Sequence, residues 1–275
     1  MDLLATKTLT PEQFQALSAM VREACGINLH EGKVGLVQGR LAGRLRELGG
    51  LDIDTYLARL AAPGGEVEAA RLVDALTTNK TSFYREPRHF ELLRGHLLPE
   101  WQRQHRRLSI WSAGCSSGEE PYTLALVLLD VLGPGADVRI LATDLSARML
   151  ASARQGVYPG EALEPVPPTL RQRYFTYIPG QTPRSYAISP EVKRLVHFAR
   201  LNLMDRWPMR GAFDLICCRN VMIYFDAATQ QRLVERFRDR LVPGGYLFTG
   251  HSESLAGLQH DFRYVQPAVY QRMAT

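Results

Sequence analysis

The sequence lacks the segments that direct a chain into or across a membrane. No run approaches the about 20 apolar residues that a spanning helix requires. The first residues show no charged start, long apolar run and cleavage site. We therefore expect a cytoplasmic protein with no direct membrane insertion. No coiled-coil pattern or internal repeat is evident, which favours a monomer.

Cysteine is scarce, with four in 275 residues: Cys25, Cys115, Cys217 and Cys218. Their positions do not form the paired spacings of metal ligands, and Cys217 and Cys218 lie within an apolar run. Free buried thiols are favoured over a metal or redox centre, and no metal is predicted.

A strong charge of either sign is also absent. The chain has 33 Lys and Arg against 28 Asp and Glu, which gives a formal net charge of +5. This balance permits an acidic partner without requiring nucleic acid, and we predict no nucleic-acid partner. Because 45% of the residues are hydrophobic, the chain can bury a core as one large domain or as one large and one small domain.

One stretch has the pattern of a strand, a Gly-rich turn and a helix. Residues 108–113 are apolar and suit a buried parallel strand, Gly114 and Gly118 bound a tight turn, and Glu119 and Glu120 begin a helix. This layout is typical of a nucleotide crevice in an α/β sheet, although the third glycine of the dinucleotide fingerprint is missing. Two carboxylates would repel a pyrophosphate there, whereas ribose hydroxyls or an amino group would suit them.

A second acidic position strengthens the nucleotide interpretation. The next strand is expected at residues 138–143 and is followed by Asp144. A carboxylate at this place can accept hydrogen bonds from both hydroxyls of a ribose. We therefore expect a nucleoside at the carboxyl ends of these two strands.

Residues 1–75 are predicted to form a small helical domain, and residues 76–275 a larger α/β domain. Thr10, Pro11 and Gln13 form the start signal of the first helix, with Thr10 as the N-cap. Further helices are expected from about Glu31 to Leu48, from Asp54 to Leu60 and from Val67 to about Leu76.

The second of these helices is expected to be amphipathic. Its apolar positions are Leu36, Val37, Leu41 and Leu45, and its basic positions are Lys33, Arg40, Arg44 and Arg46. The basic positions are interpreted as a solvated face, with a docking surface for an acidic helical partner as the alternative.

The segment that joins the two domains is polar and then aromatic. Asn79, Thr81 and Arg85 offer amide, hydroxyl and guanidinium groups to a polar ligand, and Arg85 is suited to a bidentate contact with a carboxylate. A helix cap followed by ordinary core aromatics is the alternative. An amphipathic helix is expected from His89 to Trp101.

A Pro-rich segment from residue 156 to about 194 interrupts the α/β pattern. Residues 173–178 and 185–188 could be short strands, and the insertion is interpreted as a lid or a partner-binding lobe, or else as a surface excursion. Later strands are expected at 195–200, 213–218 and 246–249, with a helix from Asp226 and a hairpin at 263–272.

Four motifs, in order along the chain, resemble the chemotaxis receptor glutamate methyltransferases of the CheR family. The motifs are Asn-Lys-Thr-Ser-Phe-Tyr-Arg-Glu at 79–86, Ser-Ala-Gly-Cys-Ser-Ser-Gly-Glu-Glu-Pro-Tyr at 112–122, Cys-Arg-Asn-Val-Met-Ile-Tyr-Phe at 218–225 and Gly-His-Ser-Glu-Ser at 250–254. The resemblance covers nearly the whole chain. It implies a class I S-adenosylmethionine (SAM)-dependent methyltransferase domain with a Rossmann-like seven-stranded sheet, an all-helical N-terminal domain and a small antiparallel β lobe inserted at about 160–195.

The resemblance also implies a cofactor site. Asn79, Thr81 and Arg85 would line the methionine end of SAM, and Glu119 and Asp144 would hold its polar groups. Asn202, Leu203, Asn220 and Val221 would border its adenosine and methionine portions. Glu120 competes with Glu119 for its role, and we favour Glu119 because it lies at the turn itself.

The implied reaction is transfer of the methyl group of SAM to glutamate side chains on the cytoplasmic helical bundle of a methyl-accepting receptor. The products would be glutamate 5-O-methyl esters and S-adenosylhomocysteine. A glutamate with a pKa near about 4.3 is already ionised at neutral pH and needs no general base. Arg85 and Tyr224 are the candidate catalytic residues, since Arg85 could orient a carboxylate and Tyr224 could shape the pocket. His251 is interpreted as structural.

Three other functions are disfavoured. Base methylases carry a Pro-Pro-Tyr-like element where this chain has residues 220–224, and a dehydrogenase would need the missing glycine. A non-catalytic scaffold that docks on receptors is opposed by the presence of Arg85, Asp144 and Asn220, but only turnover excludes it.

Overall fold

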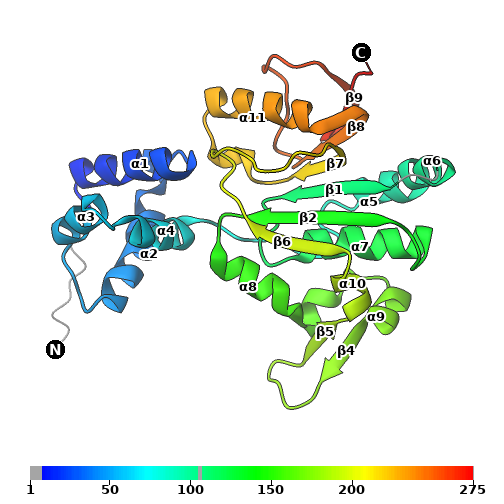
Figure 1. Ribbon diagram of the computed structural model, residues 1–275. Coiled ribbons are helices and arrows are strands. Elements are labelled where there is room, and N and C mark those ends of the chain that lie inside the picture. Colours follow the sequence, from blue (N-terminus) through cyan, green and yellow to red (C-terminus); the bar gives the residue numbers. More distant parts are fainter. Residues whose placement is uncertain (1–7, 105–106, 275) are drawn as a thin grey trace. The chain divides into compact units, whose positions relative to one another are not determined.

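The computed structural model describes residues 8–104 and 107–274, which divide into two compact units (Figure 1). One unit comprises the chain up to Thr78 together with Tyr224–Thr229, and the other comprises Asn79–Ile223 and the chain from Gln230 onward. In the described ranges no helix is both long and apolar enough to cross a bilayer. The domain boundary after residue 75 stays a prediction.

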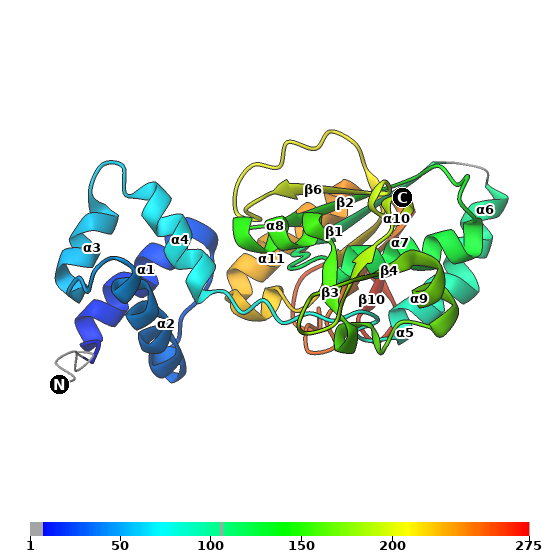
Figure 2. The same cartoon turned by 90° about the horizontal axis from the view of Figure 1, so that it is seen from below.

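The smaller unit consists of short helices (Figure 2). They are α1 (Pro11–Cys25), η1 (Glu31–Lys33), α2 (Val34–Glu47), α3 (Ile53–Ala61) and α4 (Glu66–Leu76). The predicted start of α1 is confirmed, because Thr10 Oγ1 accepts from the Gln13 N–H at 3.2 Å and Gln13 Oε1 accepts from the Thr10 N–H at 3.0 Å. Gly26 ends α1 with φ +77°, a conformation that favours glycine.

Two of the four basic positions, Arg40 and Arg44, contradict the prediction of a solvated face. Arg44 forms a bidentate ion pair with the buried carboxylate of Glu68, with Nε to Oε1 at 2.7 Å and Nη2 to Oε2 at 2.6 Å. Arg40 donates to the backbone carbonyls of Leu76 and Thr77. Both side chains therefore hold α2 against α4, while Arg46 is exposed.

The apolar face of α2 is also narrower than predicted. Val37 and Leu41 are buried as expected, whereas Leu36 is 46% exposed. The predicted helix start at Glu31 is a 3₁₀ turn, and the α-helix itself begins at Val34.

The larger unit is built on a mostly parallel seven-stranded sheet. In sheet order its strands are β6 (Val196–Arg200), β2 (Val138–Asp144), β1 (Leu108–Ala113), β7 (Phe213–Cys218), β8 (Leu241–Thr249), β10 (Val269–Arg272) and β9 (Phe262–Gln266). The first five run parallel, and the hairpin β9–β10 is antiparallel. This order brings the carboxyl ends of β1, β2, β6 and β7 together on one side of the sheet, which we call the carboxyl edge.

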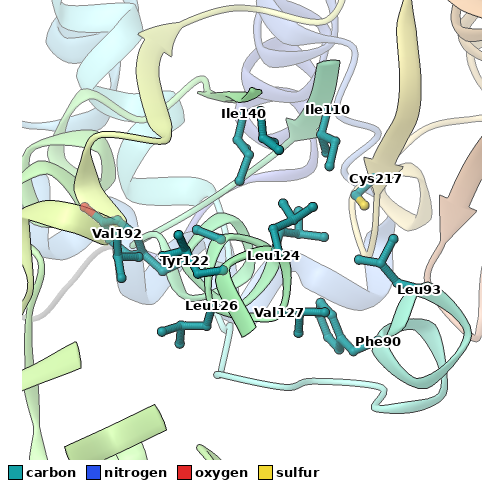
Figure 3. Close-up of a cluster of buried hydrophobic side chains, with 14 of the residues drawn as sticks. Phe90, Leu93, Ile110, Tyr122, Leu124, Leu126, Val127, Ile140, Val192 and Cys217 are labelled. Carbon is teal, nitrogen blue, oxygen red and sulfur yellow. The ribbon is translucent and has the colours of Figure 1, made fainter. Parts of the chain in front are cut away.

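Successive residues of β1 pack on opposite faces of the sheet. On one face, Ile110 contacts the apolar helix α7 (Glu119–Leu132), whose Leu124 and Val127 lie between the strands and Phe90 (Figure 3). On the other face, the Trp111 ring lies 4.8 Å from Trp207. The Trp111 ring is also 5.5 Å from Phe237 of α11 (Ala227–Arg240). Because the end of β1 and the first three turns of α7 are buried, the turn between them has a rigid base.

The remaining elements include a small antiparallel lobe. The helices are α5 (Arg88–Leu92), η2 (Leu93–Leu97), α6 (Leu98–Arg103), α8 (Ala147–Gln155), α10 (Pro190–Lys193) and η4 (Met222–Tyr224). The lobe holds β3 (Val157–Pro159), η3 (Gly160–Leu163), α9 (Pro168–Tyr174), β4 (Phe175–Ile178) and β5 (Ser185–Ile188), with strand order β3-β5-β4.

The structure confirms the predicted fold class and corrects parts of it. The seven-stranded sheet, the helical N-terminal region and the inserted antiparallel sheet are all present. Residues 173 and 174 end a helix rather than begin a strand, and β3 was not predicted. The helix expected at 89–101 is interrupted by a π-helical turn at η2. The four cysteines are free and buried, as predicted.

The first residue of the Gly-rich turn allows a direct test of the packing at the carboxyl edge. Gly114 has φ +93°, and a Cβ atom there would lie 2.4 Å from Cγ2 of Val221. We expect Gly114→Ala to lower the free energy of unfolding by about 2–5 kcal/mol, because a left-handed backbone and a clash both oppose the methyl group. Urea titration measures the change.

Gly133 provides the matched control, since it has φ +80° but open space around its Cα atom. Gly133→Ala should cost only about 1–2 kcal/mol, and Val221→Ala should recover part of the loss caused by Gly114→Ala. Equal losses for the two glycine variants would show that the contact with Val221 does not matter.

Candidate active site

The Gly-rich turn after β1 is held against the end of β2. The backbone N–H groups of Gly114 and Cys115 both donate to the Thr143 carbonyl, at 2.8 and 2.9 Å. Asp144 Oδ2 accepts from the Ser116 N–H at 2.8 Å, and Oδ1 accepts from the Ser146 N–H at 2.9 Å. Asp144 thus lies at the carboxyl edge as predicted, and it also fixes the turn.

The segment 79–86 lies beside the same turn. Ser116 Oγ donates to the Asn79 carbonyl at 2.9 Å, and the Tyr84 N–H donates to Thr123 Oγ1 of α7 at 3.2 Å. Ser116 therefore contacts both Asn79 and Asp144, which are far apart in sequence. The structure brings two of the predicted cofactor positions together at this one residue.

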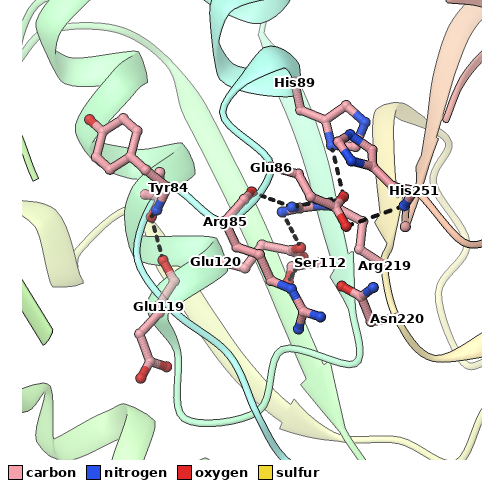
Figure 4. Close-up of polar contacts among 12 residues, drawn as sticks. Tyr84, Arg85, Glu86, His89, Ser112, Glu119, Glu120, Arg219, Asn220 and His251 are labelled. Atoms are coloured by element: carbon pink, nitrogen blue, oxygen red, sulfur yellow. Dashed lines mark hydrogen bonds and ion pairs between the residues drawn. The ribbon is translucent and has the colours of Figure 1, made fainter. Parts of the chain in front are cut away.

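Arg85 has its backbone and its side chain in different surroundings. Its carbonyl accepts a hydrogen bond from Arg219 Nη2, and its Nη1 donates to the Lys80 carbonyl at 2.7 Å. Figure 4 shows the Arg85 side chain extending away from the carboxylate of Glu86. Thr81 is half-buried in the same segment.

The two glutamates at the start of α7 differ in their partners. Glu120 Oε1 accepts from Ser112 Oγ at 2.7 Å, and its Oε2 pairs with Arg219 Nη1 at 2.9 Å. Glu119 Oε2 accepts from Ser117 Oγ at 2.7 Å, and Figure 4 shows its carboxylate pointing away from that of Glu120. Burial raises the pKa of both. Since Glu120 is engaged inside the protein, the geometry favours Glu119 as the cofactor ligand, which stays a prediction.

The other predicted cofactor residues lie on the loops after β6 and β7. The Leu201 N–H donates to the Asp144 carbonyl at 3.0 Å, which places Asn202 next to the end of β2. Leu203 is buried, and its carbonyl accepts from Trp207 Nε1 at 3.2 Å. Val221 packs against Gly114. Contact of these residues with a cofactor stays a prediction.

Tyr224 groups with the smaller unit. Its carbonyl accepts from the Asn28 N–H at 2.8 Å, and Lys33 Nζ lies 5.0 Å from the centre of its ring. Its catalytic role therefore also stays a prediction.

Sequence reasoning missed Arg219, whose guanidinium connects the third motif to the first and second motifs. Its side chain is only 3% exposed and pairs with Glu86 at 3.1 Å as well as with Glu120. Burial opposes its charge, but the carboxylates of Glu120 and Glu86 raise the pKa of Arg219. A cation directly after the apolar strand 213–218 was the sequence signal that could have identified it.

Glu253 was also missed. Its buried carboxylate accepts from the backbone N–H groups of Gly250 at 2.5 Å, Asn220 at 2.7 Å and Ile223 at 3.2 Å. These bonds hold the turn in which Asn220 adopts φ +60°. Glu253 therefore fixes the backbone of the third motif from within the fourth.

Glu86, His89 and His251 form a cluster whose donor atoms lie within 4.8 Å of one another. Glu86 Oε2 is 3.7 Å from His89 Nδ1 but is bonded to the Arg219 guanidinium, and Glu86 Oε1 accepts from the His251 N–H at 3.2 Å. A cation would have to displace this guanidinium or lie beside it. The donor set therefore does not fit a metal, and we assign none.

His89 is a buried neutral base. It is 1% exposed and stacks on Phe248 with ring centres 4.9 Å apart. Burial, with Arg219 nearby, lowers the pKa of His89 to about 3. A histidine in the unfolded chain takes up a proton below about pH 6.5, so the stability that neutral His89 provides is lost as the pH falls from 6.5 toward 3.

We therefore expect His89→Phe, which keeps the stacked ring, to flatten the pH dependence of stability. Between pH 7 and pH 5 the wild-type protein should lose about 2 kcal/mol more of its free energy of unfolding than the variant. Urea denaturation at a series of pH values measures this difference. His96→Gln, at an exposed histidine, is the control and should leave the slope unchanged; an unchanged slope for His89→Phe would contradict the assignment.

Two family descriptions match this chain over most of its length. Residues 12–77 match "CheR methyltransferase, all-alpha domain", and residues 79–270 match "CheR methyltransferase, SAM binding domain". The second match contains the whole carboxyl edge, including Asp144, Arg219 and Glu253. The pattern of a Gly-rich turn with an acidic residue after the next strand is therefore part of a SAM-binding domain.

Similar proteins from several bacteria are named chemotaxis protein methyltransferases. The chain is 42% identical to a probable chemotaxis protein methyltransferase of Rhizobium etli, covering 92% of this chain and 96% of the relative. It is 43% identical to chemotaxis protein methyltransferase 2 of Pseudomonas aeruginosa, covering 95% and 93%. It is 39% identical to the chemotaxis protein methyltransferase of Escherichia coli, covering 95% and 91%. The chain therefore belongs to the CheR family of SAM-dependent chemotaxis methyltransferases.

Proposed function

We propose that this protein is a protein-glutamate O-methyltransferase. It transfers the methyl group of SAM to glutamate side chains of methyl-accepting chemotaxis receptors, giving glutamate 5-O-methyl esters and S-adenosylhomocysteine. This reaction serves adaptation in chemotaxis signalling. The acceptor is the cytoplasmic helical bundle of the receptor, and the enzyme acts as a cytoplasmic monomer.

The observation that carries this proposal is the state of the acids and bases near the carboxyl edge. His89 is buried and neutral, Glu120 and Glu86 pair with Arg219, and Glu253 accepts three backbone N–H groups. These groups are poorly placed to remove a proton from a substrate. A glutamate acceptor is ionised at neutral pH, with a pKa near about 4.3, and needs no such group.

The residues of the site then bind and orient the two reactants. SAM, when bound, supplies an electrophilic methyl group. Glu119 and Asp144 hold polar groups of the cofactor, while Asn79, Thr81 and Arg85 line its methionine end. Asn202, Leu203, Asn220 and Val221 border the rest. Arg85 orients a carboxylate and Tyr224 shapes the acceptor pocket, so that alignment and exclusion of water provide the rate enhancement.

The reaction is tested with labelled SAM and membranes that contain a chemoreceptor. We expect label on the receptor band that is released by mild base, because carboxyl methyl esters hydrolyse under conditions that spare methylated amines. Mass spectrometry should place the modification on glutamate. Membranes without receptor are the control. Base-stable label, or no label from protein that binds SAM in calorimetry, would refute the proposal.

A second prediction concerns Arg85. Arg85→Ala should reduce kcat/KM by about 100-fold or more, because a charge-assisted bidentate contact contributes about 3 kcal/mol. Arg88→Ala is the matched control, since Arg88 is an exposed arginine three residues away. Wild-type kinetics for Arg85→Ala would remove this residue from the site without affecting the choice of substrate.

A further inference from the structure

Arg219 occupies an unusual position for a charged residue. It follows the fully buried strand β7, and its guanidinium reaches three groups: the carboxylates of Glu86 and Glu120 and the carbonyl of Arg85. Its guanidinium also lies 5.6 Å from the centre of the Phe90 ring. Removal of a charge from water is costly, and buried ion pairs are often no more stable than apolar side chains of the same shape. Stability alone is therefore a weak reason for this arrangement.

The backbone around Arg85 suggests what the arrangement does. Tyr84 has φ +53° and Glu86 has φ +57°, so Arg85 lies between two residues in the left-handed region. Residues with side chains adopt this region only where surrounding contacts hold them, and such strain concentrates at ligand-binding sites. The Tyr84 N–H is held by Thr123 Oγ1 on one side of Arg85.

Arg219 holds the other side of this strained turn. It binds the carbonyl of Arg85 and the side chain of the next residue, Glu86, with the same guanidinium. The rigid planar fork of arginine can satisfy several acceptors at fixed angles, which the single ammonium of lysine cannot do. Because the carboxylates of Glu120 and Glu86 neutralise the guanidinium, the charge of Arg219 is balanced inside the protein and is not available to a ligand.

We infer that Arg219 is a positioning residue that acts through Arg85. It stabilises the left-handed turn at residues 84–86 and so aims the Arg85 guanidinium at the carboxylate that it grips. The inference rests on the role proposed above for Arg85. It makes Arg219 important for cofactor binding without any contact between Arg219 and the cofactor.

A double-mutant cycle tests this inference on the full chain. The variants are Arg219→Lys, Arg85→Ala and the double variant, and calorimetry measures the dissociation constant of S-adenosylhomocysteine. Arg219→Lys alone should weaken binding by about tenfold, whereas in the Arg85→Ala background it should change binding by less than about twofold, because contacts that act through one residue are not additive. A merely structural role would lower affinity equally in both backgrounds.

Two further variants keep the result interpretable. Glu86→Gln weakens the contact between the turn and Arg219, so its effect on the affinity for S-adenosylhomocysteine should also depend on Arg85. This variant therefore tests the inference if Arg219→Lys does not fold. Arg238→Lys is the matched control, an arginine that pairs with Asp239 and Asp261, and it should leave binding unchanged.

Additive effects in the cycle, or wild-type affinity of Arg85→Ala, would overturn the inference. Because this assay contains no methyl acceptor, its outcome is separate from the test of receptor methylation. If Arg219→Lys and Arg85→Ala show no coupling but the receptor still takes up base-labile label, only the role of Arg219 is rejected. If the two substitutions are coupled but the receptor takes up no label, only the proposed substrate is rejected.

Discussion

The buried guanidinium of Arg219 is the interaction on which the carboxyl edge depends. It carries a full charge in a site that excludes water, so the carboxylates of Glu86 and Glu120 have to be present and in place. Glu120 lies in the first turn of α7, and Glu86 ends the first motif. The Glu86 carboxylate also accepts a hydrogen bond from the His251 N–H. One charge thereby ties together segments from all four motifs in the folded chain.

Backbone geometry provides the second constraint at this edge. Several residues with side chains adopt left-handed conformations, among them Tyr84, Glu86, Ser116 and Asn220. Each is held by polar contacts to neighbouring segments, as Ser116 is by Asp144 and Asn220 by Glu253. Strain held in this way keeps loops in one conformation, so the cofactor side of the sheet is pre-organised before a ligand binds.

The distribution of charge also limits the chemistry of the site. Glu86, Glu120 and Glu253 at the carboxyl edge are engaged in structural contacts. Burial raises the pKa values of Glu119 and Glu120 and lowers the pKa of His89, which favours the neutral form of each group. Such a site suits a reaction in which the nucleophile arrives already ionised. In the helical unit, Arg44 is likewise used for an internal ion pair, which leaves residues such as Arg46 to meet solvent or a partner.

The sequence by itself determined most of the elements of the sheet and their order, because these follow from local signals. The capping box at Thr10 and the apolar runs of β1 and β7 act over a few residues, and all were predicted correctly. The Gly-rich turn and Asp144 indicated the site for the same reason. Only the tertiary structure decided which side chains face inward and which are exposed. Leu36 is exposed, Arg44 is paired with Glu68, and Arg219 and Glu253 became visible as parts of the site only in the folded chain. Arg44 lies 24 residues from Glu68, and Glu253 lies 33 residues from Asn220. Arg219 lies 99 residues from Glu120 and 133 from Glu86, and no local pattern specifies contacts at these separations.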